Sequence, residues 1–171
     1  TAVVSTESSG VETPSVETTF QTAFPDENFR KFVNETFFSG KFKDNENLTK
    51  EMQQKLAAYT DVLDVSGNKI VNMKGIEFFT GITKLDCSHN NIQILDLSAL
   101  KQLKKLDVSY NNLAEITFAQ NNALESVDCS NNNLVMLNLA GMTGIVDLDC
   151  SNNRIGILNI SGLYNLKTLD C

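Results

Sequence analysis

The stretch LDCSHNNIQILDL, from Leu85 to Leu97, contains a pattern that recurs to the last residue of the chain. Other copies begin at Leu63, Leu106, Val127 and Leu148, and a shortened copy begins at Leu169. Successive copies are 22 residues apart once and then 21 residues apart four times. One such unit cannot bury its apolar face alone, so a fixed period of this length predicts a solenoid of stacked coils.

Each copy carries two short alternations of apolar and polar residues. In the first, Leu85 and Cys87 alternate with Asp86 and Ser88, which predicts a short strand with one buried face. The second predicts another short extended segment on the opposite wall of the coil, and it occurs at Leu95–Leu97, Leu137–Leu139 and Leu158–Ile160. Stacked coils then place equivalent strands side by side as a parallel sheet.

An asparagine closes the first strand of every complete copy, at positions Asn68, Asn90, Asn111, Asn132 and Asn153. A polar side chain at one fixed point of every coil can bond to turn amides that the parallel ladder leaves unpaired. We expect this structural role rather than a ladder of ligand-binding amides. Asn121 stands where other coils have Leu100, Met142 or Leu163, which predicts a looser back for that coil.

The four cysteines occupy one slot of the repeat, the slot that holds Val65 and Val108 in other copies. A position that accepts valine or cysteine is a small apolar core position. Side chains stacked on adjacent parallel strands stay about 4.8 Å apart, whereas a disulfide needs Cβ atoms about 3.8 Å apart. We therefore expect unbridged thiols, with the first three buried, at Cys87, Cys129, Cys150 and Cys171. No histidine accompanies the column, so a metal site is not expected.

The residues before the repeats have a different composition. Residues 1–23 are rich in Thr, Ser, Val and Glu without an apolar period, which predicts a disordered lead-in. Residues 24–60 predict a helical cap: Pro25 and the acidic residues after it open one helix, and Asn47 or Thr49 can cap a second. Such a cap covers the sheet edge and core of the first coil.

The loop between the two predicted helices does not fit a calcium site. Aligned as an EF-hand loop, it places Lys41, Lys43 and Asn45 at three ligand positions and Met52 where the bidentate glutamate belongs. Lysine is not a calcium ligand, and methionine cannot replace that carboxylate. We expect neither a metal nor a cofactor.

The phrase LxxLDxSxN at this period resembles the leucine-rich repeat family in its bacterial surface-protein form. FPDENFRKFV from Phe24, a second helical stretch and GIEFF from Gly75 are together similar to internalin-type proteins. The resemblance implies a right-handed, gently curved solenoid over residues 61–171. Its parallel β strands would line the concave face, with short extended or 3-10 segments on the back and the small α-helical cap in front. It also implies an extracellular or cell-surface location.

Catalysis, nucleic-acid binding and membrane insertion are not expected. Ser109, His89 and Asp107 are the residue types of a catalytic triad. However, every complete copy of the repeat carries that serine and aspartate, so they belong to the repeat and do not indicate catalysis. Equivalent aspartates lack the distinct environments that separate an acid from a base. The net charge of -7 opposes nucleic-acid binding, and no apolar run of 18 residues exists.

Three functions remain open. The first is a non-catalytic module that binds a protein or glycan through the concave face. The others are a passive spacer and a targeting module of a larger enzyme that continues past Cys171. The chain stops within a repeat, and solenoids need a capped end for solubility. We therefore expect a fragment of a longer protein, which when isolated shields this end by end-to-end self-association or a crystal contact, or else frays there.

The candidate ligand-binding surface is the concave face, which we expect to be acidic toward its C-terminal half. The aspartates of the strands form a column, and two lysines offset it in the early coils. Aromatic and amide side chains border it. The candidate residues are Lys84, Asp86, Lys105, Asp107, Tyr110, Asp128, Asn131, Asp147, Asp149, Asn152 and Asp170.

Overall fold

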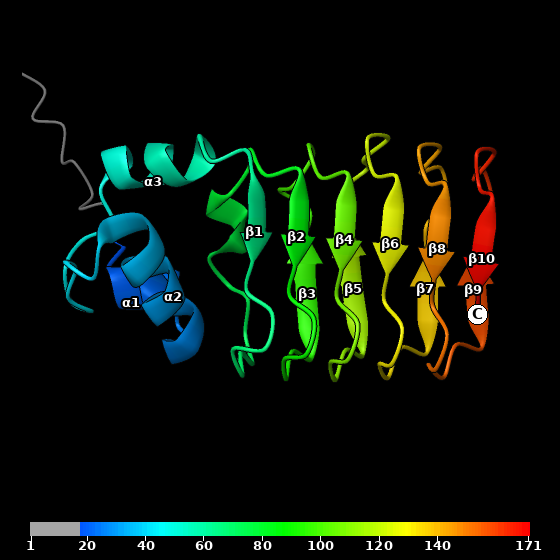
Figure 1. Ribbon diagram of the computed structural model, residues 1–171, viewed down its shortest axis with the longest axis horizontal. Coiled ribbons are helices and arrows are strands. Elements are labelled where there is room, and N and C mark those ends of the chain that lie inside the picture. The colour runs from blue at the N-terminus through cyan, green and yellow to red at the C-terminus, as the bar shows by residue number, and fades with distance from the viewer. Residues whose placement is uncertain (1–17) are drawn as a thin grey trace, which may run out of the picture.

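A computed structural model describes residues 18–171 as a helical cap followed by a parallel β solenoid (Figure 1). One wall of the solenoid is a six-stranded parallel sheet in the order β1-β2-β4-β6-β8-β10. Its strands are β1 (Val62–Asp64), β2 (Lys84–Asp86), β4 (Lys105–Asp107), β6 (Ser126–Asp128), β8 (Asp147–Asp149) and β10 (Thr168–Asp170). The structure confirms the prediction that the first strand of each repeat lies in one parallel sheet.

The opposite wall, called the back below, holds two separate two-stranded parallel sheets. These are β3 (Ile94–Leu97) with β5 (Glu115–Phe118), and β7 (Met136–Asn138) with β9 (Ile157–Asn159). The predicted second extended segments are therefore present. The first coil, residues 63–84, differs because its back carries the 3-10 helix η1 (Ile76–Phe78) in place of a strand. It is also the coil with the 22-residue spacing.

The core lies between the two walls, and the cysteine column is part of it. Val65, Cys87, Val108, Cys129 and Cys150 are all buried. All four cysteines are free, and Cys171 is exposed. The expectation of unbridged thiols with the first three buried is confirmed.

Burial should make the thiols of Cys87, Cys129 and Cys150 unreactive. It raises the pKa of Cys150 to about 11, with the neighbouring Cys171 and carboxylates adding to the effect. The pKa values of Cys87 and Cys129 are also raised, mainly by burial. Since the thiolate is the reactive form, we expect a thiol reagent at pH 8 to modify Cys171 alone in the native protein. Denaturation without reductant should release four reactive groups, and two or none would show that the unbridged assignment is wrong.

Four of the five recurring asparagines have the predicted structural role; the exception is Asn68, which is exposed and donates to Ser66 in its own turn. The side chain of Asn111 is buried; its Oδ1 accepts the amide of Ile92 at 2.9 Å, and its Nδ2 donates to the carbonyl of Cys87 in the previous coil at 2.9 Å. Asn90, Asn132 and Asn153 repeat this arrangement. Each amide thus joins two coils through backbone groups that strand pairing leaves free.

Asn121 does not merely loosen its coil. The side chain is buried, and its Nδ2 donates to the carbonyls of Leu100 at 3.3 Å and Leu103 at 2.7 Å. Its Oδ1 accepts the amide of Ala123 at 2.8 Å. Hydrogen bonds between coils therefore replace the apolar contact that a leucine makes at this position.

The cap consists of α1 (Phe20–Ala23), α2 (Glu27–Phe38) and α3 (Lys50–Ala57). Thr49 caps α3, which settles the choice between Asn47 and Thr49. Asp26 caps α2 through Oδ1, and its Oδ2 accepts the amides of Val71 at 2.8 Å and Asn72 at 3.1 Å. One carboxylate thus joins the cap to the back of the first coil.

The prediction that residues 1–23 are disordered is wrong for residues 20–23, because these residues form α1. Residues 1–17 lie outside the described residues. Phe20 is fully buried and packs its ring against Phe24 and Phe38 at centroid distances of 5.1 and 6.0 Å. Its amide donates to the carbonyl of Glu46 at 2.8 Å. The aromatic core of the cap therefore begins before Phe24.

Candidate binding face

The outward side chains of the six-stranded sheet form two columns, which together are called the sheet face. Strand register pairs each aspartate of the first column with the next, in the series Asp64, Asp86, Asp107, Asp128, Asp149 and Asp170. The second column, two residues earlier in each strand, runs Val62, Lys84, Lys105, Ser126, Asp147 and Thr168. The structure thus brings the strand members of the candidate set onto one surface.

Each aspartate from the first to the fifth coil is held by the serine two residues later. Oδ1 of Asp107 accepts the amide of Ser109 at 3.0 Å and its hydroxyl at 2.7 Å. The same amide bond recurs at Asp64, Asp86, Asp128 and Asp149. No hydrogen bond between described residues reaches Oδ2 of these five aspartates, so each orients one carboxylate oxygen and leaves the other available.

Charge is distributed unevenly along the sheet face. Lys84 and Lys105 are exposed neighbours in the early coils, whereas the later coils place Ser126 and Asp147 in that column. Within residues 18–171, ion pairs join Arg30 to Asp44 and Lys31 to Glu35, and none involves the sheet face. Asp147 instead accepts the hydroxyl of Thr168 at 2.8 Å. Negative charge therefore dominates from β6 to β10.

The rim residues of the candidate set share one backbone conformation. Tyr110, Asn131 and Asn152 each follow the strand serine and have φ of 53°, 56° and 53°. The same left-handed slot, occupied by a side chain, follows β2, β4, β6 and β8 and aligns equivalent side chains from coil to coil. Asn131 and Asn152 donate to the serine hydroxyls beside them at 3.1 and 3.4 Å.

Two aromatic rings stack at this rim, a contact that the sequence analysis did not predict. The rings of His89 and Tyr110 lie parallel, with centroids 4.5 Å apart and planes 7° apart. The repeat period places both residues at the same position of adjacent coils, although it does not specify how their rings are oriented. Since Ser109 gives its hydroxyl hydrogen bond to Asp107 and His89 stacks on Tyr110, these three residues are not arranged as a Ser–His–Asp relay.

The sheet face offers carboxylate oxygens, hydroxyls and amides at a regular spacing. Such groups can bind a cationic or hydroxyl-rich surface through hydrogen bonds and charge. In the part of the chain that the structure describes, no group of three or more His, Cys, Asp or Glu side chains could hold a metal ion. No described helix is long and apolar enough to cross a membrane.

The sequence of the chain is similar to those of known leucine-rich repeat proteins. The model of a family described as leucine-rich repeats (2 copies) matches residues 80–121. Internalin J of Listeria monocytogenes serotype 4b (strain F2365) is 38% identical over 93 residues, which are 50% of this chain and 9% of that protein.

Solved structures agree in fold. The functional domain of InlJ from Listeria monocytogenes, which includes a cysteine ladder, matches with a TM-score of 0.57 and 29% identity. The match covers 90% of this chain and 37% of that chain. Internalin inlF from strain 4b F2365 of the same species matches with a TM-score of 0.56 and 23% identity, over 90% of this chain and 52% of that one.

The chain spans less than two thirds of the length of each of these relatives. The two structural matches nevertheless each cover 90% of this chain. The chain is therefore similar to bacterial internalins and has a leucine-rich repeat fold.

Proposed function

We propose that the chain is a non-catalytic binding module of a secreted or cell-surface bacterial protein, with an adhesive role. An internalin-like repeat fold suggests a protein-binding module, and internalin homologues are surface or secreted proteins. The partner is a protein or a glycan that carries cationic or hydroxyl groups, and it binds the sheet face. The observation that carries this proposal is the register of the aspartates, five of which have one oxygen held by serine and the other available.

The acidic half of the sheet face is the expected contact. Carboxylates on strands about 4.8 Å apart repel each other by about 1 kcal/mol per pair in water. A cationic partner relieves this repulsion when it binds. Asp128, Asp149 and Asp170 lie in one column without a lysine beside them, so they would contribute most to affinity.

A triple substitution of Asp128, Asp149 and Asp170 by asparagine tests the proposal. At positions 128 and 149 asparagine retains the oxygen that accepts the serine amide, and no serine amide bonds to Asp170 among the described residues, so the fold should remain. Affinity for a partner identified by pull-down or glycan array should fall about tenfold or more at low ionic strength. The loss should shrink as salt rises, since surface charges are screened within about 10 Å at 0.1 M.

The matched control makes the same change in charge away from the sheet face. Glu35, Glu51 and Glu115 are exposed residues of α2, α3 and β5, and their replacement by glutamine should leave affinity unchanged. Equal affinity of the sheet-face variant and the wild type would contradict the proposal. In that event the serine–aspartate pairs serve the fold alone, as expected of a spacer.

A further inference from the structure

The back of the solenoid carries an open strand edge. β3 pairs with β5 on one side and is the outer strand of its two-stranded sheet. Its other side faces the first coil, which has η1 and a turn where the later coils have strands. Such an edge presents N–H and C=O groups that can pair with another chain.

The peptide groups at this edge can be assigned from the register. Strand residues turn their N–H and C=O groups alternately to the two sides, and in the later sheet Leu139 donates to Asn159. The equivalent donor in β3 is the N–H of Leu97, which points to β5. The backbone N–H and C=O groups of Ile94 and Asp96 therefore point to the first coil. In the described structure, the first coil accepts a backbone hydrogen bond just before β3, from the amide of Asn91 to the carbonyl of Ile70 at 2.8 Å, and none from β3 itself.

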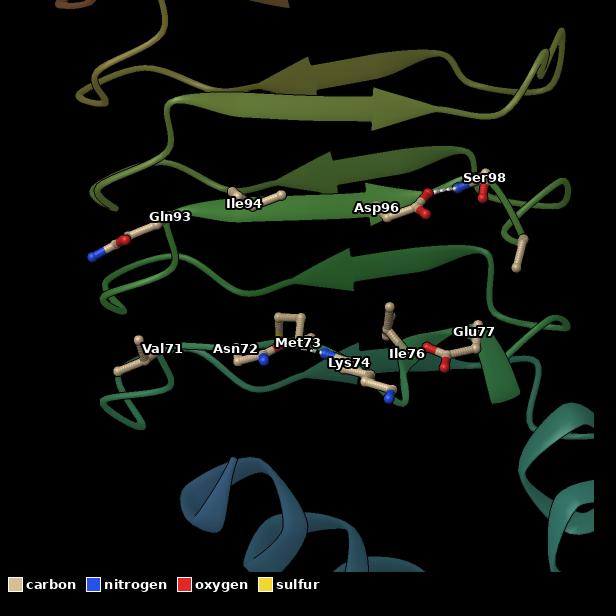
Figure 2. Close-up of a pocket in the computed structure, with 11 residues that line it drawn as sticks. Val71, Asn72, Met73, Lys74, Ile76, Glu77, Gln93, Ile94, Asp96 and Ser98 are labelled. Carbon is tan, nitrogen blue, oxygen red and sulfur yellow. Dashed lines mark hydrogen bonds between the residues drawn. The ribbon is translucent and has the colours of Figure 1, made fainter. Parts of the chain in front are cut away.

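A groove follows this edge (Figure 2). Its volume is about 670 Å³, within the range of about 300–1,000 Å³ that is typical of ligand sites. The gap between β5 and β7 holds a groove of about 260 Å³. The edge of β3 is thus the roomier opening on the back.

The walls of the groove differ along its length. At one end lie Val71 and Ile94, which are 51% and 64% exposed although both are apolar. At the other end lie Lys74, Glu77 and Asp96 (Figure 2), with a net charge of -1. A hydrogen bond from the Ser98 amide lowers the pKa of Asp96, which keeps that carboxylate charged.

The floor of the groove limits the size of an inserted side chain. Met73 and Ile76 line the groove and are 2% and 3% exposed, so they already fill the core beneath it. A strand laid beside β3 directs alternate side chains inward. An inward residue between the positions of Ile94 and Asp96 must therefore be small.

We propose that the edge of β3 binds an extended peptide of another protein as an added parallel strand. The ligand carries an apolar residue beside Ile94, a small residue over Met73, and a lysine or arginine beside Asp96. Cross-strand neighbours on one face of a sheet interact in this way, and strand addition is a common mode of peptide recognition. The site is separate from the sheet face, and it stands whether or not the sheet face binds a partner.

The test uses a synthetic heptapeptide, acetyl-Ser-Thr-Val-Ser-Lys-Thr-Ser-amide, titrated into the ¹⁵N-labelled chain at millimolar concentration. Amide shifts should change at Gln93–Asp96 and around Asn72–Lys74. Ile94→Lys should weaken binding at least tenfold. Ile157→Lys is the matched control, because Ile157 has the equivalent position on β9 and is 63% exposed; it should not alter binding.

Two changes to the peptide distinguish the addition of a hydrogen-bonded strand from side-chain contact without backbone hydrogen bonds. N-methylation of the amides that face β3 should abolish binding, and tryptophan in place of the central serine should weaken it. A peptide with glutamate in place of lysine should bind the wild type weakly and Asp96→Lys more tightly. Retained binding of the N-methylated peptide would overturn the proposal.

Other results would also overturn it. No shift at millimolar peptide would exclude the site, and shifts confined to the sheet face would assign the peptide to that surface instead. Concentration-dependent dimerisation that Ile94→Lys abolishes would identify a second copy of the chain as the occupant.

Discussion

Replacing Asn111 with alanine is expected to lower the free energy of unfolding by about 3 kcal/mol. The substitution removes an acceptor from the buried Ile92 amide and donors from carbonyls of two coils. A buried polar group that loses its partner costs about 1–3 kcal/mol, and several groups are affected here. Chemical denaturation followed by circular dichroism measures the change.

Asn68 provides the matched control for this substitution. It stands at the same position of the first coil, but its side chain is exposed and donates to the carbonyl of Ser66 in its own coil at 2.9 Å. Asn68→Ala should cost about 0.5 kcal/mol, near the lower end for one hydrogen bond. Equal effects of the two substitutions would contradict a role of the buried asparagines in joining coils.

The second large effect is expected at Asp26. Its carboxylate accepts the amides of Asn28 and Phe29 at the start of α2 and those of Val71 and Asn72 in the first coil. Hydrogen bonds to a charged group contribute about 1.5–3 kcal/mol each and are not additive. Asp26→Ala should therefore lower the free energy of unfolding by about 3–4 kcal/mol.

Thr49→Ala tests whether the effect at Asp26 exceeds the loss of a helix cap. Thr49 caps α3 through one bond to the Met52 amide at 3.3 Å, so its replacement should cost about 1 kcal/mol. Hydrogen exchange should also show faster exchange at Val71 and Asn72 in Asp26→Ala alone. Unchanged exchange there would mean that the carboxylate does not join the cap to the first coil.

The repeats could be predicted because each slot has one physical requirement. Leu85 and Leu106 share a slot that only an apolar side chain fills, and Cys87 shares another with Val108. The Asn111 slot needs a donor and an acceptor at once. A period that repeats such requirements determines the strands, their register and the buried thiols.

The start of the cap could not be predicted in the same way. The helix Phe20–Ala23 has four residues, and an isolated helix of this length is not stable in water. It exists because Phe20 packs on other rings of the cap and bonds to the carbonyl of Glu46. These contacts join residues that are distant in sequence and have no periodic signal.

The candidate surfaces were predictable to different degrees. The aspartate column follows from the period, so its placement on one face could be read from the sequence. The stack of His89 on Tyr110 requires ring orientations, which the period does not specify. The groove beside β3 arises because the first coil replaces a back strand with η1, and the longer spacing of that coil was its only trace in the sequence.

The central claim is that the sheet face binds the partner. Amide chemical-shift mapping of the labelled chain, titrated with a partner captured by the repeats, tests it most directly. We expect the largest changes at Ser126–Asp128, Asp147–Asp149 and Thr168–Asp170, with smaller changes at Lys84–Asp86. Changes concentrated instead at Ile94–Leu97 and Glu115–Phe118 on the back, with the sheet face unaffected, would contradict it.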